Sequence, residues 1–212
     1  MAAVGLGSML IQMILLTTCL GVNGTIETFV SQNYGAGLLK NCGMQLNRGF
    51  LIVSLVFLPL TIFMFFIDSV LIGLGQDPEI SVIASKFIFC SLPGTYLYVL
   101  FDARKRFLQS IEYSFVSTYT IAFTSMLHFF WCYLFIVYMQ LGVQGVAIVL
   151  NITYSLNFLI QEAYVRLYNR KKFVAYETEL FCKESLSGWK RFLILAMPTT
   201  FLTCIEWWAF EI

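Results

Sequence analysis

Long apolar stretches alternate with short polar segments along the 212-residue chain. A helix needs about 20 residues to cross the hydrocarbon core of a bilayer. Stretches near that length predict six transmembrane helices, over residues 4–29, 50–74, 83–100, 115–139, 143–164 and 192–212. The first stretch has no preceding basic segment and stays uncharged through Ile26. This favours a transmembrane helix over the alternative, a signal peptide with an apolar core of about 7–15 residues.

Composition places the chain in a bilayer rather than in water. Hydrophobic residues make up 59% of the sequence and charged residues 12%, whereas soluble domains have about 45–50% and about 25%. A soluble domain of this length lacks the interior to bury so much apolar surface. We therefore expect an all-α integral membrane protein with about six transmembrane helices.

Basic residues gather in alternate connections between the expected helices. Of the 13 Lys and Arg residues, only Lys86 lies on the side of the even-numbered connections. The others are Lys40, Arg48, Arg104, Lys105, Arg106, Arg166, Arg170, Lys171, Lys172, Lys183, Lys190 and Arg191. The positive-inside rule then places the odd-numbered connections, including residues 102–106, in the cytoplasm.

A polar segment, residues 168–191, precedes the last expected helix. Its apolar residues Phe173, Tyr176, Leu180 and Phe181 recur at helical spacing between charged residues. This pattern predicts an amphipathic helix on the inner leaflet. A solvated charged loop is the alternative.

Glu206 interrupts the apolar stretch 192–212. An acidic side chain at the centre of a membrane helix costs about 2.5–3.5 kcal/mol, so its presence indicates a functional site. The alternative is a structural carboxylate that is hydrogen-bonded to neighbouring helices. Glu211 follows five residues later, about 140° around the helix, so the two acids are not expected to share one site.

Further polar residues within or beside the stretches are candidates for lining a substrate cavity. Asn23 and Glu27 fall on one helical face with Tyr34 and nearby Ser31, and Gln32 is a further candidate. Interhelical hydrogen bonds that only hold the bundle together are the alternative for Asn23 and Glu27.

The sole histidine, His128, lies within the fourth stretch. It is a candidate for the cavity or a proton relay, and a hydrogen bond within the bundle is the alternative. Pro59, Pro93 and Pro198 also lie inside stretches. Each removes a backbone hydrogen bond and permits bending, so all three are candidate hinges.

Catalytic motifs are absent from the sequence: it has no Gly-rich phosphate loop with a Lys, no Gly-x-Ser-x-Gly and no zinc-helix motif. The six cysteines suggest neither a disulfide framework nor a metal site. Cys19, Cys90, Cys132 and Cys204 fall in expected helices, and Cys42 and Cys182 in expected cytoplasmic connections. We therefore expect neither an enzyme nor a metal protein.

Five motifs resemble those of one transporter family. Residues 30–37 read Val-Ser-Gln-Asn-Tyr-Gly-Ala-Gly, and residues 73–80 read Gly-Leu-Gly-Gln-Asp-Pro-Glu-Ile. Pro93-Gly94 precedes a Phe-Leu-Gln at 107–109, and residues 142–147 read Gly-Val-Gln-Gly-Val-Ala. Residues 196–198 read Ala-Met-Pro, and residues 204–211 read Cys-Ile-Glu-Trp-Trp-Ala-Phe-Glu. In order and spacing these motifs resemble the multidrug and toxic compound extrusion (MATE) family, in its eukaryotic form. The family often has a Pro soon after Phe-Leu-Gln, where this chain has Ser114-Phe115-Val116.

The resemblance implies part of a MATE-type bundle, corresponding to helices two to seven of twelve. Residues 1–167 would form the first lobe without its first helix. Residues 168–191 would form a cytoplasmic interlobe segment, and residues 192–212 a truncated first helix of the second lobe. A chain of this extent is not expected to transport by itself, because alternating access needs two lobes.

The resemblance also implies a secondary active antiporter that exports organic cations, or other xenobiotics and metabolites, in exchange for H⁺ or Na⁺. Glu206 and Glu211 would then be the cation-coupling acids. Trp207 and Trp208 would offer cation–π surfaces or, alternatively, anchor and pack the helix. The expected partners are small organic cations or metabolites and the lipid bilayer, without nucleic acid or a cofactor. We expect a monomer in the plasma membrane or a vacuolar or other endomembrane.

Two other functions remain open at this stage. A lipid-linked oligosaccharide flippase of related fold would line its cavity with several Arg or Lys residues, and this chain has none in mid-stretch. A multi-span receptor would usually have an external disulfide, and the expected outer connections contain no cysteine.

Overall fold

The computed structural model describes residues 2–168, 173–176 and 187–211, and the side chains of all of these except residues 168, 210 and 211. All secondary structure in these ranges is helical, and six helices are long and apolar enough to cross a membrane. The elements are α1 (Ala2–Leu10), η1 (Ile11–Leu16), α2 (Thr17–Gly35), α3 (Leu39–Met64), α4 (Ile67–Gly73), α5 (Pro78–Ser110), α6 (Ser114–Cys132), η2 (Tyr133–Tyr138), α7 (Gly142–Ala163), η3 (Tyr164–Tyr168), η4 (Val174–Tyr176) and α9 (Trp189–Glu211). The expected all-α membrane protein with six spans is confirmed.

Three of the short elements are π-helical continuations of longer helices. The segment η1 joins α1 to α2, so residues 2–35 form one continuous helix, and η2 and η3 extend α6 and α7. The expected second span, residues 50–74, divides in two. The helix α3 ends at Met64, and α4 begins at Ile67.

The helix α5 is longer than expected. The side chain of Asp77 caps it, with Oδ1 accepting hydrogen bonds from the backbone N–H groups of Glu79 (2.8 Å) and Ile80 (3.3 Å). The helix then continues to Ser110. The expectation that residues 102–106 form a connection was therefore wrong.

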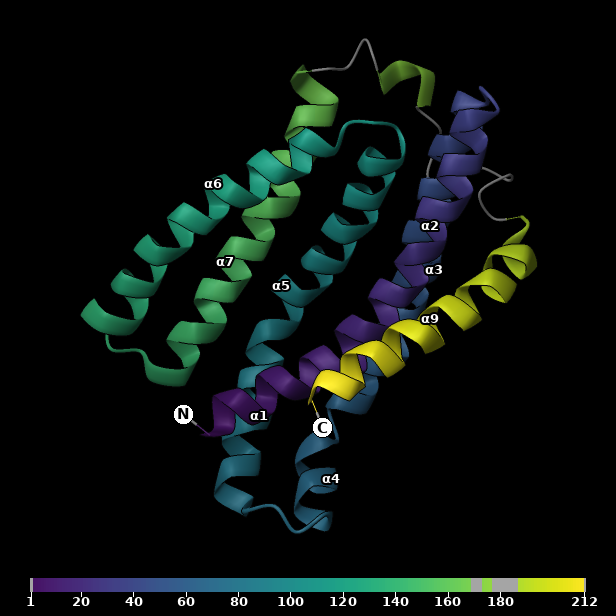
Figure 1. The fold of residues 1–212 in the computed structure, drawn as a ribbon. Coiled ribbons are helices and arrows are strands. Elements are labelled where there is room, and N and C mark those ends of the chain that lie inside the picture. The colour runs from purple at the N-terminus through teal and green to yellow at the C-terminus, as the bar shows by residue number, and fades with distance from the viewer. Residues whose placement is uncertain (1, 169–172, 177–186, 212) are drawn as a thin grey trace.

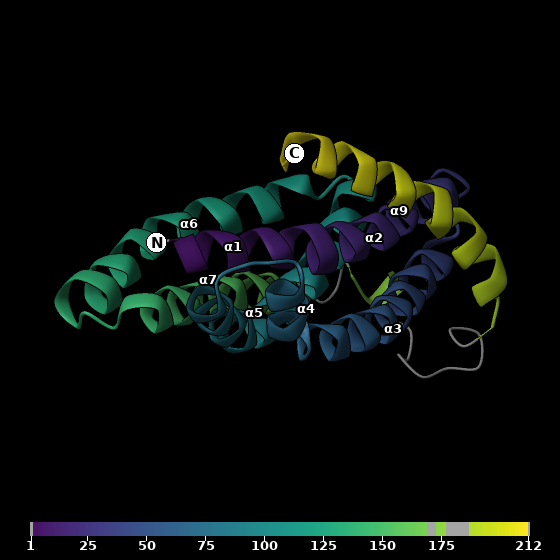
Figure 2. The same ribbon diagram turned by 90° about the horizontal axis from the view of Figure 1, so that it is seen from below.

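The central helix is α5, which packs against α1, α2, α3, α4, α6 and α7. On one side of it lies the α6–α7 hairpin, and on the other α2, α3 and α9, with α9 lying along α2 (Figures 1 and 2). The α2–α3 turn, the α5–α6 turn and the end of α7 lie at one end of the molecule (Figure 1). The turns before α5 and α7 lie at the other end. The ends of the helices that carry most of the basic residues therefore lie at one end of the molecule. This arrangement fits the expected positive-inside orientation.

The core runs between α2, α3, α5 and the start of α9. Its largest fully buried side chains include Phe87, Phe101, Phe107 and Phe192. By contrast, α6 and its extension η2 expose large apolar residues along much of their length, among them Phe123, Met126 and Phe129 of α6 and Tyr133 of η2. The buried phenylalanines pack within the bundle. The exposed apolar side chains suit contact with the lipid of a bilayer.

Residues 173–176 describe part of the polar segment expected to lie on the inner leaflet. Phe173 is buried and its ring lies 5.3 Å from that of Tyr113, while the Tyr176 ring lies 5.7 Å from that of Phe107. Burial raises the pKa of the Tyr176 hydroxyl above its ordinary value. These aromatic side chains pack on the bundle rather than on lipid.

The remainder of that segment, including Leu180, Phe181 and Cys182, lies outside the described residues. The expectation that Cys42 lies in a cytoplasmic connection was wrong. Cys42 is fully buried in the first turn of α3, because its thiol donates to the carbonyls of Leu38 and Val30 and the side chain packs into the core.

Candidate functional site

A buried polar cluster joins α2 to α5. Asn23 on α2 is fully buried, and its Nδ2 donates hydrogen bonds to the Val99 carbonyl (3.0 Å) and to Asp102 Oδ2 (3.1 Å). Asp102, on α5, is itself 4% exposed. Among the described residues, no donor pairs with Asn23 Oδ1.

Basic side chains of the same α5 turn balance the charge of Asp102. Arg106 Nε donates to Asp102 Oδ2 at 2.9 Å, and Lys105 Nζ lies 4.0 Å from Oδ1. Arg106 Nη1 also reaches Glu27 Oε2 on α2, at 3.1 Å. Asn23, Asp102, Arg106 and Glu27 therefore form one continuous network between the two helices.

Of this network, the sequence predicted Asn23 and Glu27 but not Asp102. Asn23 and Glu27 both make polar contacts with α5 in this network. Such interhelical contacts were the alternative to a role in lining a substrate cavity. Asp102 was missed because hydropathy assigned residues 102–106 to a solvated connection. The i, i+4 spacing of Asp102 and Arg106 was the available signal, since such a pair meets on one helix face.

Glu206 lies on α9, away from this network. Thr199, Thr203 and Glu206 follow i, i+4, i+7 spacing and share one face of the helix. Thr199 approaches Thr25 of α2, with 3.3 Å between the two hydroxyl oxygens. The Glu206 side chain is exposed, and no ion pair or hydrogen bond joins it to another described residue. The helix thus carries a carboxylate beside its contact with α2 without a protein partner in the described part of the chain.

Trp208, two residues after Glu206, contacts the π-helical segment η1. In η1 the N–H of Thr17 donates to the Gln12 carbonyl, five residues back, rather than to that of Met13. The Met13 carbonyl is therefore available to side chains, and it accepts from Thr17 Oγ1 (2.5 Å) and from the indole Nε1 of Trp208 (3.1 Å). This contact favours the packing role for Trp208. Trp207 is 37% exposed.

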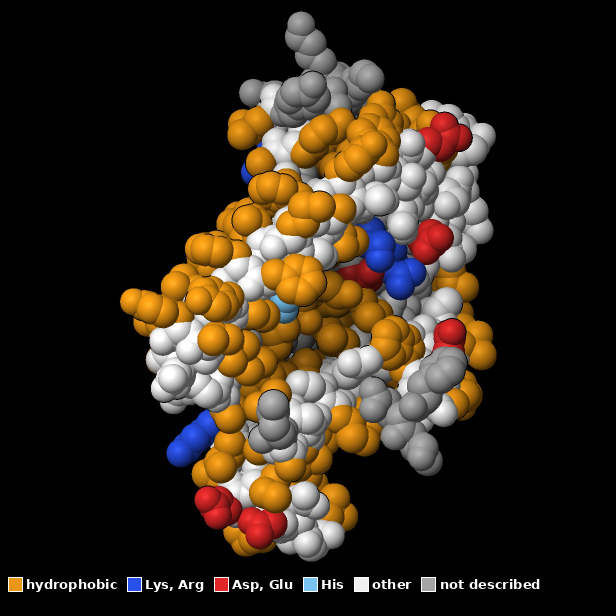
Figure 3. Space-filling view, turned by 60° about the vertical axis from the view of Figure 1, so that its left-hand side comes forward, with side chains coloured by type: hydrophobic (Ala, Val, Ile, Leu, Met, Phe, Trp, Pro, Cys, Tyr) orange, Lys and Arg blue, Asp and Glu red, His pale blue; other side chains and the backbone are white. Residues whose placement is uncertain are grey.

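His128 belongs to a separate polar seam between α6 and α7. Its Nδ1 lies 2.8 Å from Thr153 Oγ1, which is the hydrogen bond within the bundle that was the alternative to a cavity or relay role. Two further pairs, Thr124–Asn157 (2.6 Å) and Ser117–Gln161 (2.7 Å), continue the seam. In Figure 3 the histidine lies at the edge of a hollowed, largely apolar face, with acidic and basic side chains above it.

The three prolines lie inside helices, Pro59 in α3, Pro93 in α5 and Pro198 in α9. Beside Pro93, the amide of Asn151 on α7 inserts against the α5 backbone. The Gly94 N–H donates to Asn151 Oδ1 at 2.7 Å, and Asn151 Nδ2 donates to the Cys90 carbonyl at 2.5 Å. One side chain from α7 thus bonds a donor and an acceptor one turn apart on α5, where the proline weakens the helix.

The remaining candidates are dispersed. Gln32 lines a cavity between the end of α2, the start of α3 and the start of α9. The side chain of Glu211 lies outside the described residues. The structure therefore brings Asn23 and Glu27 together, places Glu206 and Trp208 along the α2–α9 contact, and separates both groups from His128.

Comparison with protein families and known proteins gives consistent matches. The family model MatE matches residues 1–134. "Protein DETOXIFICATION 17" of Arabidopsis thaliana is 28% identical over 92% of this chain, and "Protein DETOXIFICATION 48" of the same plant is 30% identical over 90%. "Multidrug and toxin extrusion protein 1" of Danio rerio is 27% identical over 91%. The chain covers 40%, 35% and 32% of these three relatives, respectively.

Two solved structures share the fold. The "Crystal structure of eukaryotic MATE transporter AtDTX14" superposes with a TM-score of 0.86 at 22% identity, covering 99% of this chain and 46% of that one. The "Inward-facing conformation of a multidrug resistance MATE family transporter of the MOP superfamily" gives a TM-score of 0.75 at 16% identity, covering 96% and 47%.

Proposed function

Because the chain belongs to the MATE family of transporters, we propose that the intact protein is a secondary active antiporter. It exports organic cations, or other xenobiotics and metabolites, by alternating access, and it takes up H⁺ or Na⁺ in exchange. Family membership favours this function over the flippase and the receptor. Relatives named for detoxification and for multidrug and toxin extrusion support the export of such compounds.

The observation that carries the proposal is the carboxylate of Glu206. It lies in a helix that is long and apolar enough to cross a membrane, and no described residue forms an ion pair with it. Leaving a charge there is costly, so the carboxylate needs a proton, a metal cation or an organic cation. Binding these in turn is the exchange that an antiporter performs.

The contact between α2 and α9 supports alternating access around this group. A Cβ at Gly21 of α2 would lie 2.4 Å from Thr200 Cα of α9, so the two backbones meet closely there. Pro198 lies two residues from Thr200 and weakens the α9 backbone. Movement of α9 about this crossing would change which side of the membrane Glu206 faces.

Vesicle transport by the Glu206→Gln variant tests the proposal. Glutamine keeps the size and hydrogen-bonding capacity of the side chain but fixes it in a neutral form. In vesicles that contain the intact protein, a pH or Na⁺ gradient should drive wild-type accumulation of a fluorescent organic cation. The variant should accumulate no more than protein-free vesicles, and Glu206→Asp should retain part of the activity with a shifted pH dependence.

Glu79→Gln is the matched control, because Glu79 is an exposed acid in the first turn of α5. It should transport like the wild type at equal amounts of inserted protein. Gradient-driven transport by Glu206→Gln at the wild-type rate, with an unchanged pH profile, would refute the coupling role and leave Glu206 a structural one.

A further inference from the structure

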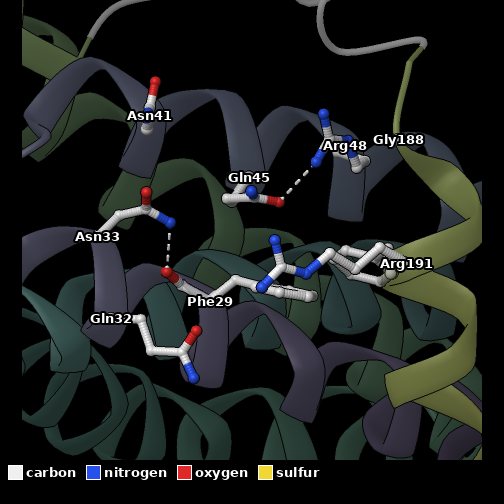
Figure 4. A pocket seen from close by; sticks show the side chains of 9 residues that line it. Phe29, Gln32, Asn33, Asn41, Gln45, Arg48, Gly188 and Arg191 are labelled. Carbon is white, nitrogen blue, oxygen red and sulfur yellow. Dashed lines mark hydrogen bonds between the residues drawn. The ribbon is translucent and has the colours of Figure 1, made fainter.

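A polar cavity of about 380 Å³ lies at the end of the molecule that holds the basic connections. It is enclosed by the last turns of α2, the first turns of α3 and the start of α9 (Figure 4). This volume is within the range of small-molecule sites, about 300–1,000 Å³. The described residues that line it include Phe29, Gln32, Asn41, Gln45, Arg48 and Arg191.

Two guanidinium groups line this cavity. Arg48 is 8% exposed, and its Nη1 donates to Gln45 Oε1 at 2.9 Å. The guanidinium of Arg191 lies 5.6 Å from the centre of the Phe29 ring and extends into the space between α2 and α3 (Figure 4).

Gly188 allows the chain to pass directly over Arg48. Its φ is +73°, a conformation that other residues rarely adopt. A Cβ there would lie 3.3 Å from Arg48 Nη2 and 3.4 Å from Cζ. A larger residue would therefore displace either the guanidinium or the start of α9, so the local backbone is fitted to the arginine.

We propose that this cavity binds the phosphate group of an anionic ligand. Guanidinium groups bind phosphate oxygens through paired, charge-assisted hydrogen bonds, and the amides of Gln32 and Asn41 add neutral donors. The group comes either from an anionic lipid of the inner leaflet, which is attracted to basic segments, or from a soluble phosphate compound. Because α2, α3 and α9 all line the cavity, the ligand holds these three helices together.

Binding measurements on the purified intact protein test this site. Thermal unfolding is followed in detergent with sodium phosphate against sodium chloride at equal ionic strength. It is also followed in nanodiscs of phosphatidylcholine with and without phosphatidic acid. A ligand that binds only the folded state raises the unfolding midpoint. We expect the wild-type midpoint to rise with phosphate, phosphatidic acid or both, and the pattern identifies the source of the phosphate group.

Arg191→Gln removes one guanidinium, and Lys190→Gln is its control. Lys190 is an exposed neighbour that does not line the cavity, and its replacement makes the same change of charge. Arg191→Gln should weaken the apparent affinity at least about tenfold, whereas Lys190→Gln should leave it within about twofold of the wild type.

Arg48→Gln provides a second test, which is read only from variant protein that elutes as a monodisperse species. The unfolding midpoint of Arg48→Gln should no longer rise with phosphate or phosphatidic acid. A wild-type midpoint that responds to neither ligand would overturn the proposal, as would equal losses in Arg191→Gln and Lys190→Gln. The transport assay of Glu206→Gln does not depend on this cavity, so the two proposals fail separately.

Discussion

Asp102 and Arg106 form a buried ion pair whose geometry is set within one turn of α5. Arg106 Nε lies 2.9 Å from the carboxylate, and the side chain of Asp102 is 6% exposed. The hydrogen bond from Asn23 satisfies part of the remaining capacity of the carboxylate. Removing one partner of a buried pair costs more than the pair contributes, because an uncompensated charge is left behind.

Asp102→Asn should therefore destabilise the intact protein by about 3 kcal/mol, the lower end of the range for a broken buried pair. The substitution keeps the shape of the side chain but removes the carboxylate that Lys105 approaches and leaves Arg106 paired with Glu27. Glu27→Gln is the control, because its side chain is 51% exposed and exposed pairs contribute less than about 1 kcal/mol. Chemical denaturation of both variants in detergent measures the difference. Equal losses of stability would contradict the central place of Asp102 in the network.

Some functional candidates could be predicted from the sequence and others could not. Glu206 was recognisable from the sequence because its charge contrasts with an apolar stretch. Asp102 was not, because neighbouring basic residues made its surroundings resemble a connection. Asn151 gave no signal either, since its partners, Cys90 and Gly94, are distant in sequence and are bonded through their backbone atoms. A pattern along the chain does not show tertiary contacts of that kind.

The helices α5 and α7 meet closely beside Pro93. A Cβ at Gly94 would lie 2.3 Å from Asn151 Oδ1 and 2.6 Å from its Cα, so the two helices approach without room for a side chain. The Asn151 amide bonds the Gly94 N–H and the Cys90 carbonyl in the same place. The sequence predicted the position of Pro93 inside a helix, but only the structure shows that Asn151 bonds the backbone beside it.

Gly94→Ala and Asn151→Ala should both destabilise the α5–α7 contact. The alanine at 94 forces the helices apart, while Asn151→Ala removes two hydrogen bonds to the α5 backbone, at about 1 kcal/mol each. Gly5→Ala, in α1, is the control because a Cβ there has no atom within 4 Å. Unfolding midpoints should fall for the first two variants and remain unchanged for the third. Unchanged stability of Asn151→Ala would show that its bonds to α5 are not required.

The whole molecule follows largely from the hydropathy pattern. Five of the six expected spans correspond to spanning helices whose ends differ by up to ten residues, and the expected second span is divided between α3 and α4. Apolar length alone determines such spans, so the sequence was sufficient for them. The polar cavity was not predictable, because Arg48 of α3 and Gly188 and Arg191 at the start of α9 are far apart in sequence and only the folded chain brings them together.

Proton release on binding of an organic cation tests the central claim most directly. If a proton and the organic cation compete for Glu206, adding tetraphenylphosphonium to the intact protein in lightly buffered, Na⁺-free detergent solution should release protons, which a pH-sensitive dye detects. The wild type and Glu79→Gln should release protons to the same extent. Glu206→Gln should release none, because its side chain carries no exchangeable acid. Undiminished proton release from Glu206→Gln would contradict the account.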